Sequence, residues 1–341
     1  MPQDWPRLAS YLHAQGMRLD LDLEPRQFAT GLANLNYRVS VDGALAVLRR
    51  PPAGPLAEGA NDLAREFRVL DALHGPLPLV PRPLHLCLDT SVLGAPFEVI
   101  EHRSGSAVGG RLPDEIADRP DAGPALTSSL VATMATLHSL QPDTLGLSDL
   151  GRPEGFLRRQ VVGWGRRADA VFPDGRPRAL SAIVEHLEST VVEESAVALL
   201  HGDLKFDNVL FDLQTLQPTA VVDWDMATRG DPLFDLAVLL SYWIEADDPV
   251  TLHDLGQVPS LEPGFPSRRE VAAQYFAACG RPLEDLAFHL TLARLRLAVA
   301  WVQLYRQYER GTVRDPRYAT FEKTAQAVLD WTADTLDAPP L

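Results

Sequence analysis

Cysteine, lysine and long apolar runs are all scarce in this sequence of 341 residues. The two cysteines, Cys87 and Cys279, lie far apart without a CxxC pattern, so the sequence predicts neither a zinc site nor a disulfide framework. Residues 1–16 lack the basic start and apolar core of a signal peptide. No apolar run approaches the roughly 20 residues that span a bilayer. We therefore expect a cytoplasmic protein with no membrane partner.

Positive charge is also in short supply. The formal net charge is −15 at pH 7, which argues against a nucleic-acid partner, because nucleic acids attract clustered Lys and Arg. An acidic chain is compatible with a cationic substrate, but the same charge can serve solubility alone. Only Lys205 and Lys323 are lysines among the 31 Lys and Arg residues. Because lysine is so rare, Lys205, which lies in the most polar motif, is a candidate functional residue.

That motif lies in the segment Leu199–Leu236. Two short apolar runs in it, 209–211 and 219–222, are predicted strands. Polar side chains precede the first strand and follow the second: Asp203, Lys205, Asn208 and Asp223. Mg²⁺ prefers a few oxygen ligands together with substrate phosphates. The pattern therefore indicates phosphoryl transfer.

The first hundred residues are predicted to be rich in strands. A short amphipathic helix over 5–16 precedes strands near 36–41 and 44–49, which the Asp42-Gly43 turn pairs as an antiparallel hairpin. The turn Thr30–Asn34 before this hairpin could bind phosphate through backbone N–H groups and the Asn34 and Asn36 side chains, and an ordinary β-turn is the alternative. A helix over 59–74, which carries Glu66, and strands over 83–88 and 96–101 follow.

The composition changes near residue 103, where we place a domain boundary between residues 1–103 and 104–341. The length allows one large domain or two. Downstream of the boundary, helical periodicity predominates. The predicted helices cover residues 124–140, 154–172, 178–194, 233–246, 267–280, 283–310 and 317–336. The predicted fold class is therefore α+β, with an antiparallel sheet first and a mainly helical part second.

This layout resembles that of protein-kinase-like small-molecule kinases. The segment 201–208 reads HGDLKFDN and 221–225 reads VVDWD. On these motifs the chain resembles the aminoglycoside phosphotransferase family, which is similar to choline and ethanolamine kinases, over residues 25–335. Through VLRRPPAG, REFRVLDAL and HGDLKFDNVLFD it is most similar to the group that includes kinase-like domains fused to some acyl-CoA dehydrogenases. The resemblance implies a bilobal protein-kinase-like fold with a hinge at the end of the first lobe.

The resemblance also implies roles for the polar motif. Asp203 matches the catalytic aspartate, which orients the acceptor hydroxyl and accepts its proton. Lys205 would contact the γ-phosphate or steady Asp203, and a surface lysine is the alternative. Asn208 and Asp223 match the ligands of Mg²⁺. His201 and Asp235 match residues that hold the loop in place.

Arg49 is a departure from the kinase pattern. Kinases supply a lysine to the phosphates from the matching strand, held by a helix glutamate, for which Glu66 is the natural partner. Arginine can bind phosphate and pair with carboxylate. Arg50 is an alternative, because adjacent strand residues face opposite sides, and a surface arginine is another. The connector that includes Glu101 and His102 is expected to present backbone groups to the nucleotide base.

These features together imply a Mg²⁺-dependent kinase that transfers the γ-phosphate of ATP, with GTP left open, to a small-molecule hydroxyl. The segment 245–248 could hold a cationic acceptor or be a solvated helix end, and Arg294 and Arg296 could bind a carboxylate or CoA phosphate or lie on a helix surface. Tyr242 belongs to the same acceptor region. One alternative is a kinase of hydroxyacyl metabolites. Another is a nucleotide-binding pseudokinase that acts as an interaction module. The oligomeric state is not predicted.

Overall fold

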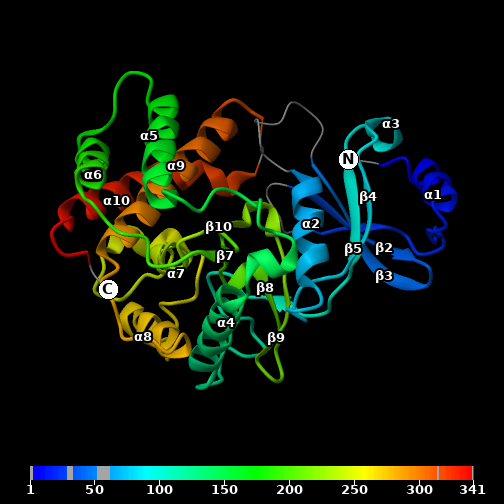
Figure 1. Cartoon of the computed structure of the whole chain (residues 1–341), viewed down its shortest axis with the longest axis horizontal. Helices are drawn as coiled ribbons and strands as arrows, with labels where there is room; N and C mark the ends of the chain where they lie inside the picture. Colours follow the sequence, from blue (N-terminus) through cyan, green and yellow to red (C-terminus); the bar gives the residue numbers. More distant parts are fainter. Residues whose placement is uncertain (1–2, 29–33, 52–61, 313–314, 340) are drawn as a thin grey trace. The chain divides into compact units, whose positions relative to one another are not determined.

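The computed structural model describes residues 3–28, 34–51, 62–312, 315–339 and 341. The chain forms two compact units, which we call the N-terminal unit and the C-terminal unit (Figure 1). The N-terminal unit contains Met1–Gly105, Leu145–Leu147 and Thr219–Ala227. The C-terminal unit contains Ser106–Thr144, Ser148–Pro218 and Thr228–Leu341.

An antiparallel sheet forms the N-terminal unit. Its strand order is β1-β2-β3-β5-β4. Asp42 and Gly43, between β2 and β3, have φ angles of 54° and 79°, as a two-residue type I′ hairpin turn requires. The predicted hairpin is therefore confirmed. The strands are β1 (Arg26–Gln27), β2 (Leu35–Val41), β3 (Ala44–Arg50), β4 (Pro83–Cys87) and β5 (Phe97–Glu101).

The two faces of this sheet differ in chemistry because side chains alternate along each strand. One face packs apolar residues such as Leu48 and Phe97 against Leu8 and Leu12 of helix α1 (Trp5–Ala14). Arg49 and Glu98, each one position away along its strand, belong to the other face, on the side of helix α2 (Leu63–Leu73). Figure 1 shows α1 and α2 in blue on either side of strands β4 and β5. A short helix α3 (Thr90–Leu93) joins β4 to β5.

Helices form most of the C-terminal unit. Helix α7 lies at its centre, and all ten of its residues are buried. Asp231 caps the start of α7 by accepting a hydrogen bond from Leu233 N, and Pro232 occupies the first helical position. The helices are α4 (Ala122–Ser139), α5 (Phe156–Val171), α6 (Arg178–Ser189), α7 (Pro232–Ser241), α8 (Arg268–Ala278), α9 (Ala287–Glu309) and α10 (Phe321–Asp334).

Five short strands precede, follow or pair beside the segment that contains the polar motif. Strand β7 (Ala198–Leu200) pairs with β10 (Thr228–Gly230), and β6 (Ser106–Ala107), β8 (Val209–Asp212) and β9 (Gln217–Val221) follow the order β6-β8-β9. Residues 201–208 connect β7 to β8 and end in the 3₁₀ turn Phe206–Asn208. Because both ends of this connection enter strands, the loop is held at both sides. Other 3₁₀ turns are Pro142–Leu145, Trp224–Met226, Val250–Leu255 and Pro316–Thr320.

The predicted α+β arrangement is confirmed, with differences at a few helix ends. The helix predicted over 233–246 ends at Ser241, because the N–H groups of Tyr242 and Trp243 tighten onto the carbonyls of Leu239 and Leu240. The helix predicted over 317–336 begins as a 3₁₀ turn. Among the described helices, none is both long and apolar enough to cross a bilayer.

The left-handed backbone of Gly43 predicts the effect of a substitution on stability. Gly43→Ala should lower the free energy of unfolding by about 1–2 kcal/mol, since an L-residue is disfavoured there and a Cβ would meet no neighbouring atom. Urea unfolding measures this cost. Gly109→Ala is the matched control, because Gly109 is exposed, lacks a positive φ and also has no atom near a Cβ. Equal effects of the two substitutions would contradict the interpretation.

Candidate functional site

A buried guanidinium, that of Arg49 in β3, lies among three carboxylates in the N-terminal unit. Its Nε is 3.1 Å from Glu66 Oε2 and 3.8 Å from Glu98 Oε1, and its Nη2 is 2.5 Å from Asp223 Oδ1. Arg50 faces the other side of the sheet, where it donates to Leu93 O at 2.7 Å. Strand alternation therefore makes Arg49, and not Arg50, the partner of Glu66.

Asn34 completes the surroundings of this guanidinium. With the oxygen of its side-chain amide turned toward Arg49, it accepts hydrogen bonds from Nη2 at 2.9 Å and from Nε at 3.2 Å. Asn34 is the one residue of the predicted phosphate-binding turn that is described, since Thr30 to Ala33 lie outside the described residues. The amide thus adds a polar neighbour to Arg49 and no charge.

The side chain of Glu98 belongs to this cluster, although no sequence pattern indicated it. Glu98 is opposite Arg49 in the sheet, and its carboxylate accepts no hydrogen bond from any described residue. Burial raises the pKa of Glu98 well above its usual value, and the charge of Glu66 adds to this effect while Arg49 opposes it. Glu98 is therefore the carboxyl group of this cluster that most readily keeps a proton. The antiparallel pairing of β3 with β5 is the signal that could have identified it.

Asp223 is the accessible member of the cluster, with 39% of its side chain exposed. Its backbone is left-handed, with φ 69° and ψ 62°, a conformation that Asp tolerates better than most residues. Helix α2 holds the chain just after it: Glu66 Oε1 accepts from Trp224 N at 3.2 Å, and Arg65 donates to the Asp225 carbonyl. Unusual backbone geometry of this kind is often found at functional positions.

The connector residues Glu101 and His102 have part of their backbone already engaged. Glu101 N donates to Arg82 O at 2.8 Å, and His102 N donates to Leu45 O at 3.4 Å. The side chain of Glu101 accepts from Arg82 N at 3.0 Å. The N–H groups of Glu101 and His102 are therefore paired within the N-terminal unit.

In the C-terminal unit, the loop 201–208 gathers opposite charges around Asp203. Lys205 Nζ lies 3.1 Å from Asp203 Oδ2 and 2.7 Å from Asp207 Oδ1, and it is buried. Asn208 Nδ2 donates to Asp203 O at 2.8 Å and lies 3.4 Å from Asp203 Oδ2. Lys205 is therefore not a surface lysine.

The other carboxylate oxygen of Asp203 has more distant neighbours. Tyr242 donates to Oδ1 at 3.4 Å, and Arg296 Nη2 lies 3.6 Å from it. Burial would raise the pKa of Asp203, but Lys205 and then Arg296 outweigh it and lower this pKa to about 2. Asp203 is thus ionised throughout the neutral range. Tyr242 and Arg296 were predicted only to belong to the acceptor region, and their contact with Asp203 was not predicted.

Asp235 of α7 holds the backbone of this loop. Its Oδ2 accepts from His201 N at 2.8 Å and its Oδ1 accepts from Gly202 N at 2.8 Å. His138 Nε2 lies 3.3 Å from Oδ2, while its Nδ1 faces Tyr275 OH at 2.7 Å. The position of His201, Gly202 and Asp203 is therefore fixed by one buried carboxylate.

Two of the three carboxylates in the acidic segment 245–248, those of Glu245 and Asp248, are paired with an arginine, whereas Asp247 is exposed. Arg268 Nη1 lies 2.5 Å from Asp248 Oδ2, and Arg268 Nη2 lies 2.8 Å from Glu245 Oε2. Arg268 and Asp248 are buried, so Asp248 does not belong to a solvated helix end, and Arg268 offsets part of the negative charge of the segment. Arg294 is not on the helix surface either, because it is buried 3.8 Å above the ring of Trp331.

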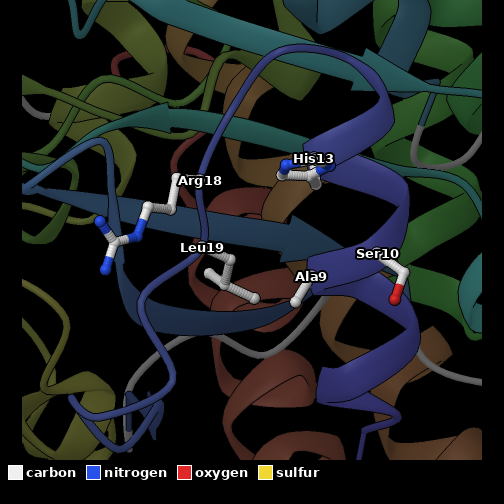
Figure 2. A pocket seen from close by; sticks show the side chains of 5 residues that line it. All are labelled: Ala9, Ser10, His13, Arg18 and Leu19. Carbon is white, nitrogen blue, oxygen red and sulfur yellow. The ribbon is translucent and has the colours of Figure 1, made fainter.

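A surface hollow of about 390 Å³ lies beside α1 in the N-terminal unit (Figure 2). Its lining residues are Ala9, Ser10, His13, Arg18 and Leu19. None of these is a candidate residue, and His13 and Arg18 are exposed. We therefore assign this hollow no part in the candidate site.

Comparison with known proteins identifies the family to which these groups belong. The phosphotransferase enzyme family (APH) matches residues 24–271. The chain belongs to this family. Among its relatives is acyl-CoA dehydrogenase family member 11 of Gallus gallus, which is 32% identical over 90% of this chain but only 40% of the relative. The chain thus spans less than half the length of the curated relatives it matches.

Solved structures show that this phosphotransferase has the fold of its family. A candidate aminoglycoside phosphotransferase from Ralstonia eutropha JMP134 matches with a TM-score of 0.80 and 24% identity, over 98% of this chain and 99% of the other. A thermostable mutant of aminoglycoside phosphotransferase APH(4)-Ia, in ternary complex with AMP-PNP and hygromycin B, matches with a TM-score of 0.61 and 15% identity, over 98% and 99%. The predicted family and its kinase-like α+β fold are confirmed.

The contacts of Asp235 predict how the phosphotransferase responds to its loss. Asp235→Ala should lower the free energy of unfolding by at least about 1–3 kcal/mol at pH 7, since two buried N–H donors lose their acceptor. Burial would raise the pKa of Asp235, but His138, His201 and the N–H donors lower it on balance. Because the pKa of Asp235 is lower in the folded protein than the value near 4 of the unfolded chain, ionised Asp235 stabilises the fold above about pH 4. This stabilisation is lost as the pH falls through the lowered pKa. Denaturation at several pH values should therefore show the variant and wild type converging below about pH 4.

The matched control for this prediction is Asp71→Ala. Asp71 lies exposed on α2, so its substitution should change stability by less than about 0.5 kcal/mol. A cost at Asp235 no larger than that at Asp71, or one that does not depend on pH, would contradict the role given to Asp235.

Proposed function

We propose that this phosphotransferase is a Mg²⁺-dependent kinase that transfers the γ-phosphate of ATP to a hydroxyl group of a small molecule. The environment of Asp203 carries this proposal. Its carboxylate is kept ionised by two cations, and Oδ2 is held by Lys205 and Asn208 while Oδ1 has longer contacts. A hydroxyl group that donates to Oδ1 would find the carboxylate already oriented.

The phosphoryl transfer step follows from these groups. The acceptor oxygen forms a bond to the γ-phosphorus, the bond from that phosphorus to the bridging oxygen breaks, and the hydroxyl proton passes to Asp203. With its pKa lowered to about 2, Asp203 is a weak base. A weak base suits a loose transition state, in which positioning and charge stabilisation contribute most of the catalysis. We therefore assign Asp203 chiefly the task of orienting the hydroxyl, with Lys205 as its counter-ion.

We assign nucleotide binding to residues 1–103, a lobe that ends in the connector, and the catalytic loop and acceptor site to residues 104–341. Arg49 and Asn34 would contact the nucleotide phosphates, and Glu66 would fix the direction of the Arg49 guanidinium. The carbonyl groups of Glu101 and His102 would face the base. Arginine keeps its charge at every accessible pH, so the replacement of lysine does not remove the cation that phosphate requires.

Two residues fit Mg²⁺. Asp223 offers an accessible carboxylate, and Asn208 donates with its amide nitrogen to Asp203, so that its amide oxygen is the atom left for a cation. Carboxylate and amide oxygens are suitable ligands for this ion. When bound, Mg²⁺ would neutralise charge that develops on the phosphate oxygens.

One observation favours an acceptor that is not a polycation. The carboxylates of Glu245 and Asp248 are paired with Arg268, and Arg296 places a positive charge beside Asp203. Hydroxyacyl metabolites, which are neutral or anionic, are therefore our second candidate class of acceptor. The similarity to an acyl-CoA dehydrogenase family member agrees with it. The pseudokinase alternative is weaker, because Arg49 keeps Glu66 as its partner.

Nucleotide binding should depend on both the metal and Asp223. We expect MgATP to raise the melting temperature of the wild type, and ATP with a chelator to raise it little or not at all. Asp223→Ala should abolish the metal-dependent part of the shift, whereas Asp22→Ala, an exposed aspartate of the same unit, should retain it. The same measurement with MgGTP shows whether the protein binds the adenine or the guanine nucleotide. A full metal-dependent shift in the Asp223 variant would refute the metal assignment.

Phosphate transfer should depend on Asp203. A screen of aminoglycosides, choline, homoserine, hydroxy acids and hydroxyacyl-CoAs with γ-labelled ATP would identify the acceptor. On that acceptor, Asp203→Asn should lower kcat by about 10² to 10⁴, and Asp143→Asn, an exposed control, should not. If the Asp203 variant transferred phosphate as fast as wild type, its assignment as catalytic residue would fail.

A further inference from the structure

The two oxygens of the Asp203 carboxylate are held unequally. Lys205 and Asn208 lie 3.1 and 3.4 Å from Oδ2. Tyr242 and Arg296 lie 3.4 and 3.6 Å from Oδ1. Contacts of this length in a protein without substrate commonly tighten when the reacting complex forms. Oδ1 is therefore the oxygen with room for one more hydrogen-bond partner.

Arg296 has a firm anchor beside this oxygen. It projects from α9 and donates through Nη2 to the carbonyl oxygen of Gly202 at 2.8 Å. The N–H of the same glycine donates to Asp235 of α7. The peptide groups on both sides of Gly202 are thus bound, one by a helix carboxylate and one by a helix guanidinium. Arg296 fixes the backbone that carries Asp203 as well as lying beside its side chain.

Arg294, the other arginine in this part of α9, does not contact Gly202 or Asp203 in the way that Arg296 does. Arg294 turns its guanidinium onto the ring of Trp331, 3.8 Å away, next to the buried Arg268. Arg296 keeps 11% of its side chain exposed, whereas Arg294 is buried. Arg294 and Arg296, although separated by one residue, therefore have different neighbours.

We propose that Arg296 is a positioning residue for phosphoryl transfer, which acts with Tyr242 to hold Oδ1 of Asp203 in the orientation that receives the acceptor hydroxyl. This inference rests on the proposed function. Carboxylate rotation about its two side-chain bonds is restricted from one side by Lys205 and from the other by Arg296 and Tyr242. Positioning of reacting groups is a large part of what an enzyme contributes to such a step. The motif HGDLKFDN does not contain Arg296, which lies 93 residues after Asp203.

The test compares Arg296→Gln, Arg296→Lys, Arg296→Ala and Tyr242→Phe with Arg306→Gln. Arg306 is the matched control, since it lies on the same helix, forms ion pairs with Glu309 and Glu322, and lies over the ring of Tyr305. Release of phosphate from MgATP to water needs no identified acceptor, and transfer to the acceptor from the screen is measured beside it. The melting temperature with and without MgATP reports nucleotide binding separately.

We expect Arg296→Gln to lower kcat by at least tenfold while KM for MgATP stays within threefold of wild type. Arg296→Lys should recover part of the loss, and millimolar guanidinium should partly restore Arg296→Ala. Because Arg296 and Tyr242 act on the same oxygen, the double variant Arg296→Gln/Tyr242→Phe should lose less than the product of the single losses. Arg306→Gln should leave kcat unchanged.

Three results would overturn this role. One is a kcat within twofold of wild type in Arg296→Gln. Another is a parallel loss of kcat, MgATP affinity and melting temperature without rescue by lysine or guanidinium, which would indicate a structural arginine. The third is a wild type that transfers phosphate neither to water nor to any acceptor. That last result contradicts the proposed function itself, whereas an active wild type with an equally active Arg296→Gln contradicts only the inference about Arg296.

Discussion

The buried carboxylate of Asp235 is the group on which the candidate residues of the C-terminal unit depend. It binds the N–H groups of His201 and Gly202, and so fixes the start of the loop that carries Asp203, Lys205 and Asn208. A charged acceptor forms stronger hydrogen bonds than a neutral one, and a buried donor that loses its partner is costly. The loop is therefore rigid because its backbone is bound, before any of its own side chains interact.

Arg49 likewise connects several segments of the N-terminal unit, but it binds their side chains and not their backbone N–H groups. Its guanidinium joins strand β3, helix α2 and the segment after β9 through Glu66 and Asp223. Burial would lower the pKa of Arg49, and the surrounding carboxylates reverse this and raise it. A lysine could satisfy fewer of these neighbours at once, since its ammonium group is a single point of charge. The arginine suits a cluster in which several carboxylates converge.

Short sequence patterns predicted the structural features that depend on residues close together in the chain. The Asp42-Gly43 turn and the order of residues in HGDLKFDN identified the hairpin and the candidate loop, and alternation along β3 reduced the choice to Arg49 or Arg50. The contacts that the sequence did not reveal all join distant segments. Glu98 meets Arg49 through strand pairing, Arg296 reaches Asp203 from α9, and Arg268 of α8 pairs with Glu245 and Asp248. No periodicity or spacing encodes such pairs, because they arise only when the helices and strands pack.

The scarcity of lysine has a chemical consequence for how this protein can be studied. Of the two lysines, Lys205 is buried in ion pairs with Asp203 and Asp207, and Lys323 is exposed on α10. Amine acylation requires the free base, and the paired carboxylates raise the pKa of Lys205 despite its burial. Lys323 is therefore the lysine that an amine-acylating reagent should modify first, and modification of Lys205 should require its ion pairs to open.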